Sequence, residues 1–262
     1  MQLEINGHEV YVATGNREPD PQKETVLFIH GTGQDHTIWV LPTRYFARHD
    51  RNVLAVDLPG HGRSGGDPLE SIEAMADWAV QVLDAAGISS AAVVGHSLGS
   101  LVAIATAARH PQRVRVIALV GVTVPMPVSG FLLDNAKEDK HEAIEMLNYW
   151  GYSKSAQLGG NATPGNWMLG GGLRLMEKAR PGVIHNDLNA CNKYIEGMDH
   201  AASIECPALL ILGERDMLTP VRSAMRVAEA LPNAEKAILE GSGHALLAER
   251  PDPVLDQLIR VV

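Results

Sequence analysis

The sequence predicts an α/β protein with a mostly parallel sheet, helices on both of its faces and one inserted helical segment. Short apolar segments alternate with segments of helical periodicity, as in parallel strands joined by helices. This alternation stops between residues 124 and 203 and then resumes. Loops that follow parallel strands open on one edge of the sheet, so residues distant in sequence can meet there.

Eight segments read as strands. Asn6-Gly7 separates the first two and favours a tight turn between antiparallel strands. The others are mainly short apolar runs, which indicate strands buried on both faces. The expected strands are residues 2–5, 9–13, 25–29, 52–56, 91–94, 114–120, 208–212 and 236–239.

Capping residues predict where several helices begin. Ser71 precedes a segment of 3.6-residue apolar period and is suited to cap it. Thr219-Pro220 and Asp252-Pro253 place a capping side chain before a proline, which is favoured in the first helical turn. Helices are therefore expected after these positions.

The interruption predicts the domain organisation. Residues 124–203 contain helical and loop patterns with no clear strand, and we interpret them as a cap over the strand ends. Residues 1–123 and 204–262 then form the core domain.

Composition excludes several classes of protein. The 262 residues are 45% hydrophobic and 20% charged, as expected for a soluble globular chain. The net charge of −9, with no cluster of Lys and Arg, argues against nucleic acid or anionic membranes as partners.

Neither a secretory signal nor an apolar run of membrane-spanning length is evident, so a cytoplasmic location is expected. The two cysteines, Cys191 and Cys206, lack metal-ligand spacing and make no disulfide framework. The oligomeric state is left open.

The segment Gly95-x-Ser97-x-Gly99 has the pattern of a nucleophile elbow. An apolar strand enters it, and a helical segment at 101–109 leaves it. A serine on so sharp a turn has a strained backbone, which requires very small residues on either side. The N-terminus of the following helix then presents free N–H groups to the same place.

Serine chemistry also needs a base and an acid that orients it. His244 follows the last expected strand, and Asp216 follows the strand before it. Both side chains are therefore expected at the sheet edge where Ser97 lies.

Five motifs occur in one order along the chain: His30-Gly31, Asp57-x-Pro59-Gly60-x-Gly62-x-Ser64, Gly95-His96-Ser97-Leu98-Gly99, Gly213-x-x-Asp216 and Gly243-His244. Together they resemble the α/β-hydrolase superfamily over almost the whole length of the chain. The resemblance implies the α/β-hydrolase fold. It makes Ser97 the nucleophile, His244 the general base and Asp216 the orienting acid. It also places the backbone N–H groups of Thr32 and Leu98 in the oxyanion hole.

The same resemblance narrows the chemistry. Some members carry the acid after the strand that follows the elbow helix, but residues 114–128 contain no Asp or Glu. Epoxide hydrolases and haloalkane dehalogenases resemble this fold but use Asp at the elbow, where this chain has Ser97. Both activities are therefore disfavoured.

Other polar residues are assigned no chemistry. We expect His30 and His61 to hold loops together and give His96 no role. Gly60-x-Gly62-x-x-Gly65 matches a dinucleotide fingerprint, but no helix opens on its glycines. Neither a metal nor a cofactor is expected. Four residues that lack a clear ligand spacing are interpreted as solvated cap residues, namely His185, Asp187, Asp199 and His200.

Large apolar side chains are the candidates for a substrate pocket. Trp39 flanks the oxyanion loop and Met217 flanks the acid, so both are expected as pocket walls. Trp150, Trp167 and Met168 of the cap are expected either in its small core or in an adaptable apolar pocket.

These observations favour hydrolysis of small-to-medium carboxylic esters through an acyl-enzyme, with a small-molecule ester as the substrate. Lactonase, thioesterase, perhydrolase and carbon–carbon bond hydrolase share the same triad and stay open. The loop Gly31-Thr32-Gly33-Gln34-Asp35 lacks the proline typical of carbon–carbon hydrolases, which counts mildly against them. A receptor that keeps the fold without catalysis is the alternative from another class.

Overall fold

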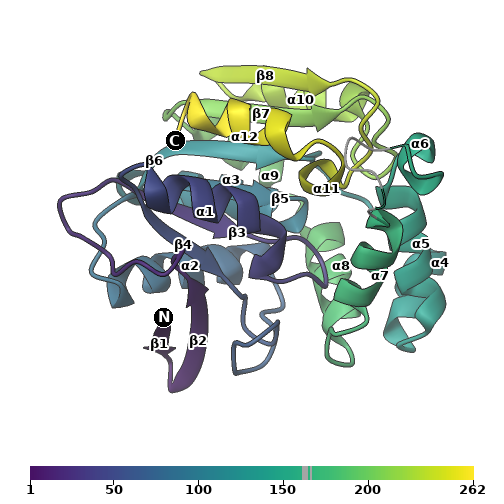
Figure 1. The fold of residues 1–262 in the computed structure, drawn as a ribbon, viewed down its shortest axis with the longest axis horizontal. Helices are drawn as coiled ribbons and strands as arrows, with labels where there is room; N and C mark the ends of the chain where they lie inside the picture. The colour runs from purple at the N-terminus through teal and green to yellow at the C-terminus, as the bar shows by residue number, and fades with distance from the viewer. Residues whose placement is uncertain (161–164, 166) are drawn as a thin grey trace.

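The computed structural model describes residues 1–160, 165 and 167–262, which form an eight-stranded sheet of order β1-β2-β4-β3-β5-β6-β7-β8 (Figure 1). β1 and β2 form the predicted antiparallel hairpin, β2 pairs antiparallel with β4, and the strands from β3 to β8 pair in parallel. The strand bounds are β1 Gln2–Ile5, β2 His8–Ala13, β3 Thr25–Ile29, β4 Asn52–Val56, β5 Ala91–His96, β6 Val114–Val120, β7 Ala208–Gly213 and β8 Ala234–Leu239. The predicted fold class is confirmed.

Two hydrophobic cores cover the two faces of the sheet. Successive side chains of a strand point to opposite faces, so Leu27 and Ile29 of β3 enter one core while Val26 and Phe28 enter the other. The first core contains α2 Ile72–Ala85, α3 Leu98–Arg109, α9 Gly197–Ser203 and α10 Val221–Ala230. The second contains α1 Val40–Arg48, α11 Leu246–Glu249 and α12 Pro251–Ile259. Burial on both faces explains the continuous apolar runs of these strands.

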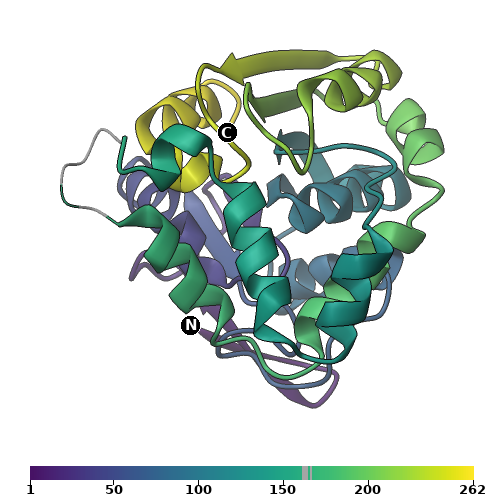
Figure 2. The ribbon, with the colours of Figure 1, turned by 90° about the vertical axis from the view of Figure 1, so that its right-hand side faces the viewer.

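Helices inserted between β6 and β7 lie over the carboxyl edge of the sheet (Figures 1 and 2). They are α4 Gly130–Lys137, α5 His141–Gly151, α6 Lys154–Gln157, α7 Met168–Met176 and α8 Val183–Lys193. Leu132, Leu147 and Leu188 join α4, α5 and α8 in a small core of their own.

Helix α9, which the sequence assigned to the cap, packs instead on α3 and α10 and contributes Ala201 to the first core. We therefore propose that the cap comprises α4 to α8 and ends before α9 rather than at residue 203.

The helix starts agree only in part with the capping patterns. The Ser71 hydroxyl accepts from Ala74 N at 3.1 Å and caps α2 as predicted. Thr219 does not cap α10, which begins at Val221 after Pro220, because its hydroxyl donates to Asp216. The last helix begins at Pro251, so Asp252 lies in its first turn instead of capping it.

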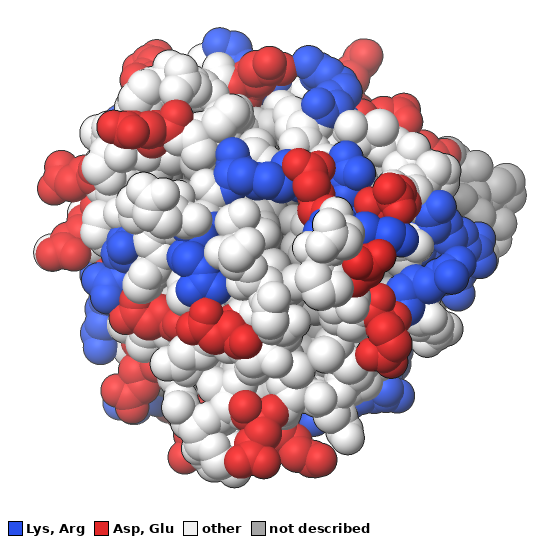
Figure 3. Space-filling model, turned by 90° about the vertical axis from the view of Figure 1, so that its left-hand side faces the viewer, with Lys and Arg blue, Asp and Glu red and all other residues white. Residues whose placement is uncertain are grey.

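The surface shows no large region of one sign on the face opposite the cap. Figure 3 shows Lys and Arg side chains interspersed with Asp and Glu over that face. No helix among the described residues is long and apolar enough to cross a membrane.

The turn between β5 and α3 forms because two glycines let backbone segments approach closely. Ser97 has φ 54° and ψ −117°, a strained conformation for a residue with a side chain. A Cβ at Gly95 would overlap the carbonyl of Gly99, and a Cβ at Gly99 would overlap the carbonyls of Ile29 and His30. The small residues predicted beside Ser97 are therefore sterically required.

Replacing Gly99 by alanine is expected to lower the free energy of unfolding by about 1–3 kcal/mol or more, because the added methyl group meets backbone that cannot yield separately. Gly171→Ala is the matched control, since Gly171 lies inside α7 and an added Cβ there meets nothing within 4 Å. That change should stabilise by about 0.5–1 kcal/mol. Urea unfolding compares the two, and equal free energies for both variants would contradict the steric argument.

Candidate active site

Ser97, Asp216 and His244 follow three strands of the parallel part of the sheet and meet at its carboxyl edge. Ser97 comes directly after β5, Asp216 closely follows β7, and His244 closely follows β8. All three are buried or partly buried beneath the cap. The sheet topology thus brings together the three side chains that the sequence singled out.

Asp216 and His244 form a buried pair. Asp216 Oδ2 lies 2.8 Å from His244 Nδ1 and accepts from the Thr219 hydroxyl at 2.6 Å. Its Oδ1 accepts from the N–H groups of Leu218 and Thr219 at 2.8 and 2.7 Å. Burial by itself raises the pKa of Asp216, but the charge of His244 and these hydrogen bonds outweigh it and lower the pKa to about 2.

Because Asp216 is a carboxylate, it can only accept, and His244 Nδ1 must carry the proton. His244 Nε2 is then the ring's free acceptor, and the ring lines the cavity. Gly121, with φ +65°, makes room for the ring, since a Cβ there would lie 3.0 Å from its Nδ1.

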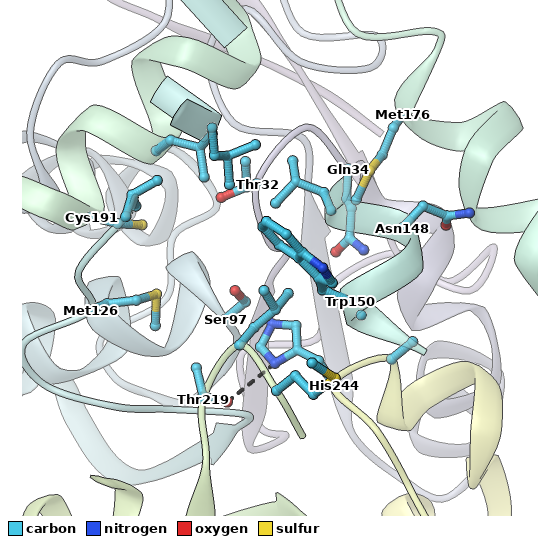
Figure 4. Close-up of a pocket in the computed structure, with 18 of the residues that line it drawn as sticks. Thr32, Gln34, Ser97, Met126, Asn148, Trp150, Met176, Cys191, Thr219 and His244 are labelled. Carbon is cyan, nitrogen blue, oxygen red and sulfur yellow. Dashed lines mark hydrogen bonds between the residues drawn. The ribbon is translucent and has the colours of Figure 1, made fainter. Parts of the chain in front are cut away.

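Ser97 lies beside His244 in the wall of the same cavity (Figure 4). Among the described residues, the Ser97 hydroxyl makes no hydrogen bond to His244, and in Figure 4 it is turned away from the ring. A hydrogen bond between the two requires a rotation of the serine side chain. Contacts of this kind are often loose in unliganded enzymes and tighten when substrate binds.

Two backbone N–H groups near Ser97 have no hydrogen-bond partner among the described residues. Leu98 begins α3, so its N–H has no partner within the helix. Within the loop 31–34, Gly31 N donates to Gln34 Oε1, Gly33 N to Asp187 and Gln34 N to the carbonyl of Gly31. Across the described chain, neither the Leu98 N–H nor the Thr32 N–H donates to a protein acceptor. The two positions suit the oxyanion hole that the resemblance implied.

Three histidines near the site hydrogen-bond to the backbone of the surrounding loops. His96 Nε2 lies 3.0 Å from the carbonyl of His244, and burial together with the charge of His244 lowers the pKa of His96 to about 3. His30 Nε2 accepts from Leu58 N, and burial lowers its pKa to about 4. His61 bonds the carbonyl of Pro59 and the carboxylate of Asp187. His30 and His61 hold loops as expected, and His96 fixes the backbone of His244.

A cavity of about 280 Å³ lies between Ser97 and the cap. Most of its wall is apolar, and its polar side chains include Gln34, Asn148 and the indole of Trp150 in addition to Ser97 and His244 (Figure 4). Among the described residues that line it there is no Lys, Arg, Asp or Glu. The apolar side chains of the wall include Met126, Val128, Leu132, Leu147, Met176 and Leu188.

Only two of the five expected pocket residues line this cavity. These two residues are Trp150 and Met217. Trp39 does not, because it is fully buried in the core on one face of the sheet, stacked on Phe28 at 4.9 Å. Met168 packs in a small core of the cap with Tyr152, and Trp167 is 69% exposed. The expectation of a pocket wall is therefore wrong for Trp39 and Trp167, while Met168 follows the other alternative, a place in a small core of the cap.

Thr219 and Gln34 are site residues that the sequence reasoning missed. Thr219 is buried against both Asp216 and His244 Nδ1, the latter at 3.2 Å. The Asp-x-x-Thr spacing of a side-chain turn was the available signal. The side-chain carbonyl of Gln34 accepts a hydrogen bond from Gly31 N at 3.2 Å, and Gln34 lines the cavity. No local pattern identifies it beforehand.

One group of side chains in the described chain is close enough to share a metal ion: Asp35, His36 and Asp57. Asp57 already accepts from the backbone and ring of His36 at 2.7 Å and from Arg63 N at 2.9 Å. These contacts make Asp57 a support for the loops 35–36 and 57–63.

Comparisons with known proteins place the fold in context. A model of the alpha/beta hydrolase family matches residues 26–257. A putative carbamate hydrolase, RutD, from Escherichia coli O9:H4 (strain HS) is 30% identical over 248 residues, covering 89% of each chain. A thermophilic esterase structure is 25% identical with TM-score 0.83, covering 99% of this chain and 95% of that one. The enol-lactonase of Burkholderia xenovorans LB400 is similar in fold, with TM-score 0.86 at 20% identity and coverage of 99% and 98%.

The low pKa of Asp216 predicts a pH-dependent stability. Because the pKa is about 2 in the folded state, below the unfolded value of 3.8, the stabilisation is complete above about pH 4. It is lost as the pH falls through about 2. Asp216→Asn should therefore lower the unfolding free energy by about 2 kcal/mol at pH 7 and by less at pH 3.

Urea unfolding of the wild type and the variant at both pH values measures this difference. Asp67→Asn, at an exposed carboxylate, serves as the control and should change stability little. A deficit of Asp216→Asn that is as large at pH 3 as at pH 7 would contradict the prediction.

Proposed function

Because the chain belongs to the alpha/beta hydrolase family, we propose that it is a serine hydrolase that cleaves small-to-medium neutral carboxylic esters. In this proposal Ser97 is the nucleophile, His244 the general base and Asp216 the residue that orients His244. The observation that carries it is the Asp216–His244 pair, with its Nε2 free, beside a serine on a strained elbow.

The proposed reaction has two halves. Ser97 Oγ attacks the ester carbonyl while His244 Nε2 takes its proton, and the Thr32 and Leu98 N–H groups stabilise the oxyanion. Collapse of this intermediate releases the alcohol, which receives the proton from His244, and leaves an acyl group on Ser97. Water, deprotonated by His244, then attacks the acyl-enzyme, and the carboxylic acid leaves as Ser97 regains its proton.

The cavity wall supports a neutral substrate. An anionic group buried among apolar side chains without a cation pays a desolvation cost of several kcal/mol. No Lys or Arg occurs among the described residues of this wall. The relative named as a carbamate hydrolase cleaves carbamate by its name, but this cavity offers no cation to a carbamate anion. We therefore favour an ester over carbamate.

A fluorophosphonate probe tests the proposed nucleophile. It should label Ser97 of the wild type, and Ser97→Ala should lose labelling and about 10⁶-fold in turnover of p-nitrophenyl butyrate while keeping its melting temperature. Ser129→Ala is the control, since Ser129 lines the same cavity, and it should retain labelling at Ser97. Labelling at another residue, or an active Ser97→Ala protein, would overturn the assignment.

A pair of esters of similar shape tests the proposed neutral preference. We expect the kcat/KM for p-nitrophenyl 4-methylpentanoate to exceed that for p-nitrophenyl hemisuccinate at least about tenfold, because the terminal carboxylate of the latter finds no cation. A lactone and a thioester of similar length belong in the same assay. Equal kcat/KM values for the pair would show that the acyl group does not enter this cavity.

A further inference from the structure

Asp187 on α8 is fully buried, which corrects its interpretation as a solvated cap residue. Its Oδ2 accepts from Gly33 N at 2.9 Å and lies 2.9 Å from His61 Nε2. Its Oδ1 has no hydrogen-bond partner among the described residues. Burying a carboxylate costs free energy unless hydrogen bonds or an opposite charge compensate for the lost water. The contacts of Oδ2 with Gly33 and His61 provide this compensation for Asp187.

His61 forms an ion pair with this carboxylate. Its Nδ1 lies 3.0 Å from the carbonyl of Pro59 and its Nε2 faces Asp187, so each ring nitrogen must carry a proton to donate. Burial lowers the pKa of His61, but the charge of Asp187 together with the hydrogen bonds to Asp187 and Pro59 outweighs this effect and raises the pKa overall. The charge pair spans the cap and the core, since His61 belongs to the loop after β4.

Asp187 holds the peptide next to Thr32. The N–H groups of Gly31, Gly33 and Gln34 are all bonded, and that of Thr32 remains free within the described chain. Gly33 has φ +62°, and a Cβ there would lie 2.9 Å from the side chain of Ile184, also on α8. Helix α8 therefore packs directly on this loop and fixes the Thr32–Gly33 peptide plane.

We propose that Asp187 is a positioning residue for the oxyanion hole: from the cap helix α8, it holds Gly33 so that the Thr32 N–H points at the developing oxyanion. The inference rests on the proposed function. Asp187 does not line the cavity, so it acts through the loop and not on the substrate. Loss of its charge weakens the bond to Gly33 N and removes the ion pair with His61, so the loop can shift and carry with it the adjoining Gly31–Thr32 peptide, which bears the Thr32 N–H. Misplacement of a transition-state contact by about 1 Å costs on the order of 100-fold in rate.

Displacement of the Thr32 N–H should weaken binding of the transition state more than binding of the substrate. A trigonal ester or amide gains little from the hole, whereas a tetrahedral oxyanion depends on it. Loss of the contacts that hold the Thr32 loop should therefore lower both kcat/KM and the affinity for a tetrahedral analogue, by similar factors. Binding of a trigonal analogue should stay nearly unchanged.

The test compares Asp187→Asn, which keeps the shape of the side chain, with Asn186→Ala. Asn186 is the matched control: it lies on the same helix and donates to the carbonyl of Leu69 in the core at 2.8 Å, away from the loop. The assays are kcat/KM for p-nitrophenyl butyrate, inhibition by an alkyl trifluoromethyl ketone, which forms an oxyanion on serine, and inhibition by hexanamide. Active sites are counted by fluorophosphonate labelling at completion.

For Asp187→Asn we expect a loss of about 10- to 100-fold in kcat/KM per active site, with an equal rise in the trifluoromethyl ketone inhibition constant. The hexanamide constant should change less than about threefold, and Asn186→Ala should resemble the wild type in all three assays. Parallel losses for all three ligands, or for both variants, would reduce Asp187 to a structural role and overturn the inference. Unchanged kinetics in Asp187→Asn would also overturn it.

The wild type separates this inference from the proposed function. A wild-type protein that is neither labelled at Ser97 nor active on the ester overturns both. A labelled and active wild type with an indifferent Asp187→Asn overturns the inference alone. If Asp187→Asn unfolds, the variant His61→Gln provides a second test. It removes the positive charge that pairs with Asp187 but leaves the hydrogen bond between Asp187 and Gly33 in place. Its kcat/KM should then fall less than about tenfold, and a loss of 100-fold or more would contradict the proposed role of the Gly33 bond.

Discussion

The close approach between the first turn of α3 and the end of β3 is the constraint on which the site depends. Gly99 lies against the carbonyls of Ile29 and His30, a position that a Cβ would block. The chain leaving β3 continues directly into the loop that carries Thr32, while α3 begins at Leu98. This backbone contact therefore sets how far the loop of Thr32 lies from Ser97 and Leu98, and the strain at Ser97 persists because this packing holds it.

Buried carboxylates organise the loops around that contact. Asp216 accepts from two N–H groups of its own turn and lies 2.8 Å from His244 Nδ1. Glu249 accepts from Gly243 N at 3.0 Å and from Ser153 N of the cap at 3.2 Å, joining the loop of His244 to the cap. Asp187 joins the cap to the loop of Thr32. Carboxylates suit this task because each accepts several hydrogen bonds, and bonds to a charged acceptor are stronger than neutral ones.

The cap thus contributes more than the cavity wall. Its apolar side chains shape the space above Ser97, while backbone and carboxylate contacts connect it to the loops on both sides of the sheet edge. The Gly151 carbonyl also accepts from Ala245 N at 2.8 Å, next to His244. Changes in the cap are therefore expected to affect both the fit of the proposed substrate and the geometry of the loops beneath it.

Local patterns in the sequence were enough to place the strands, the mostly parallel character of the sheet, the elbow at Ser97 and the loops that carry Asp216 and His244. Strand periodicity and glycine spacing involve residues that are close in sequence, so they can be recognised before the tertiary structure is known. The burial of Trp39, the turn made by Thr219 and the bond between Gly33 and Asp187 were not predicted. Gly33 and Asp187 are 154 positions apart, and such a contact leaves no local pattern because only the packing of α8 on the sheet edge brings the two together.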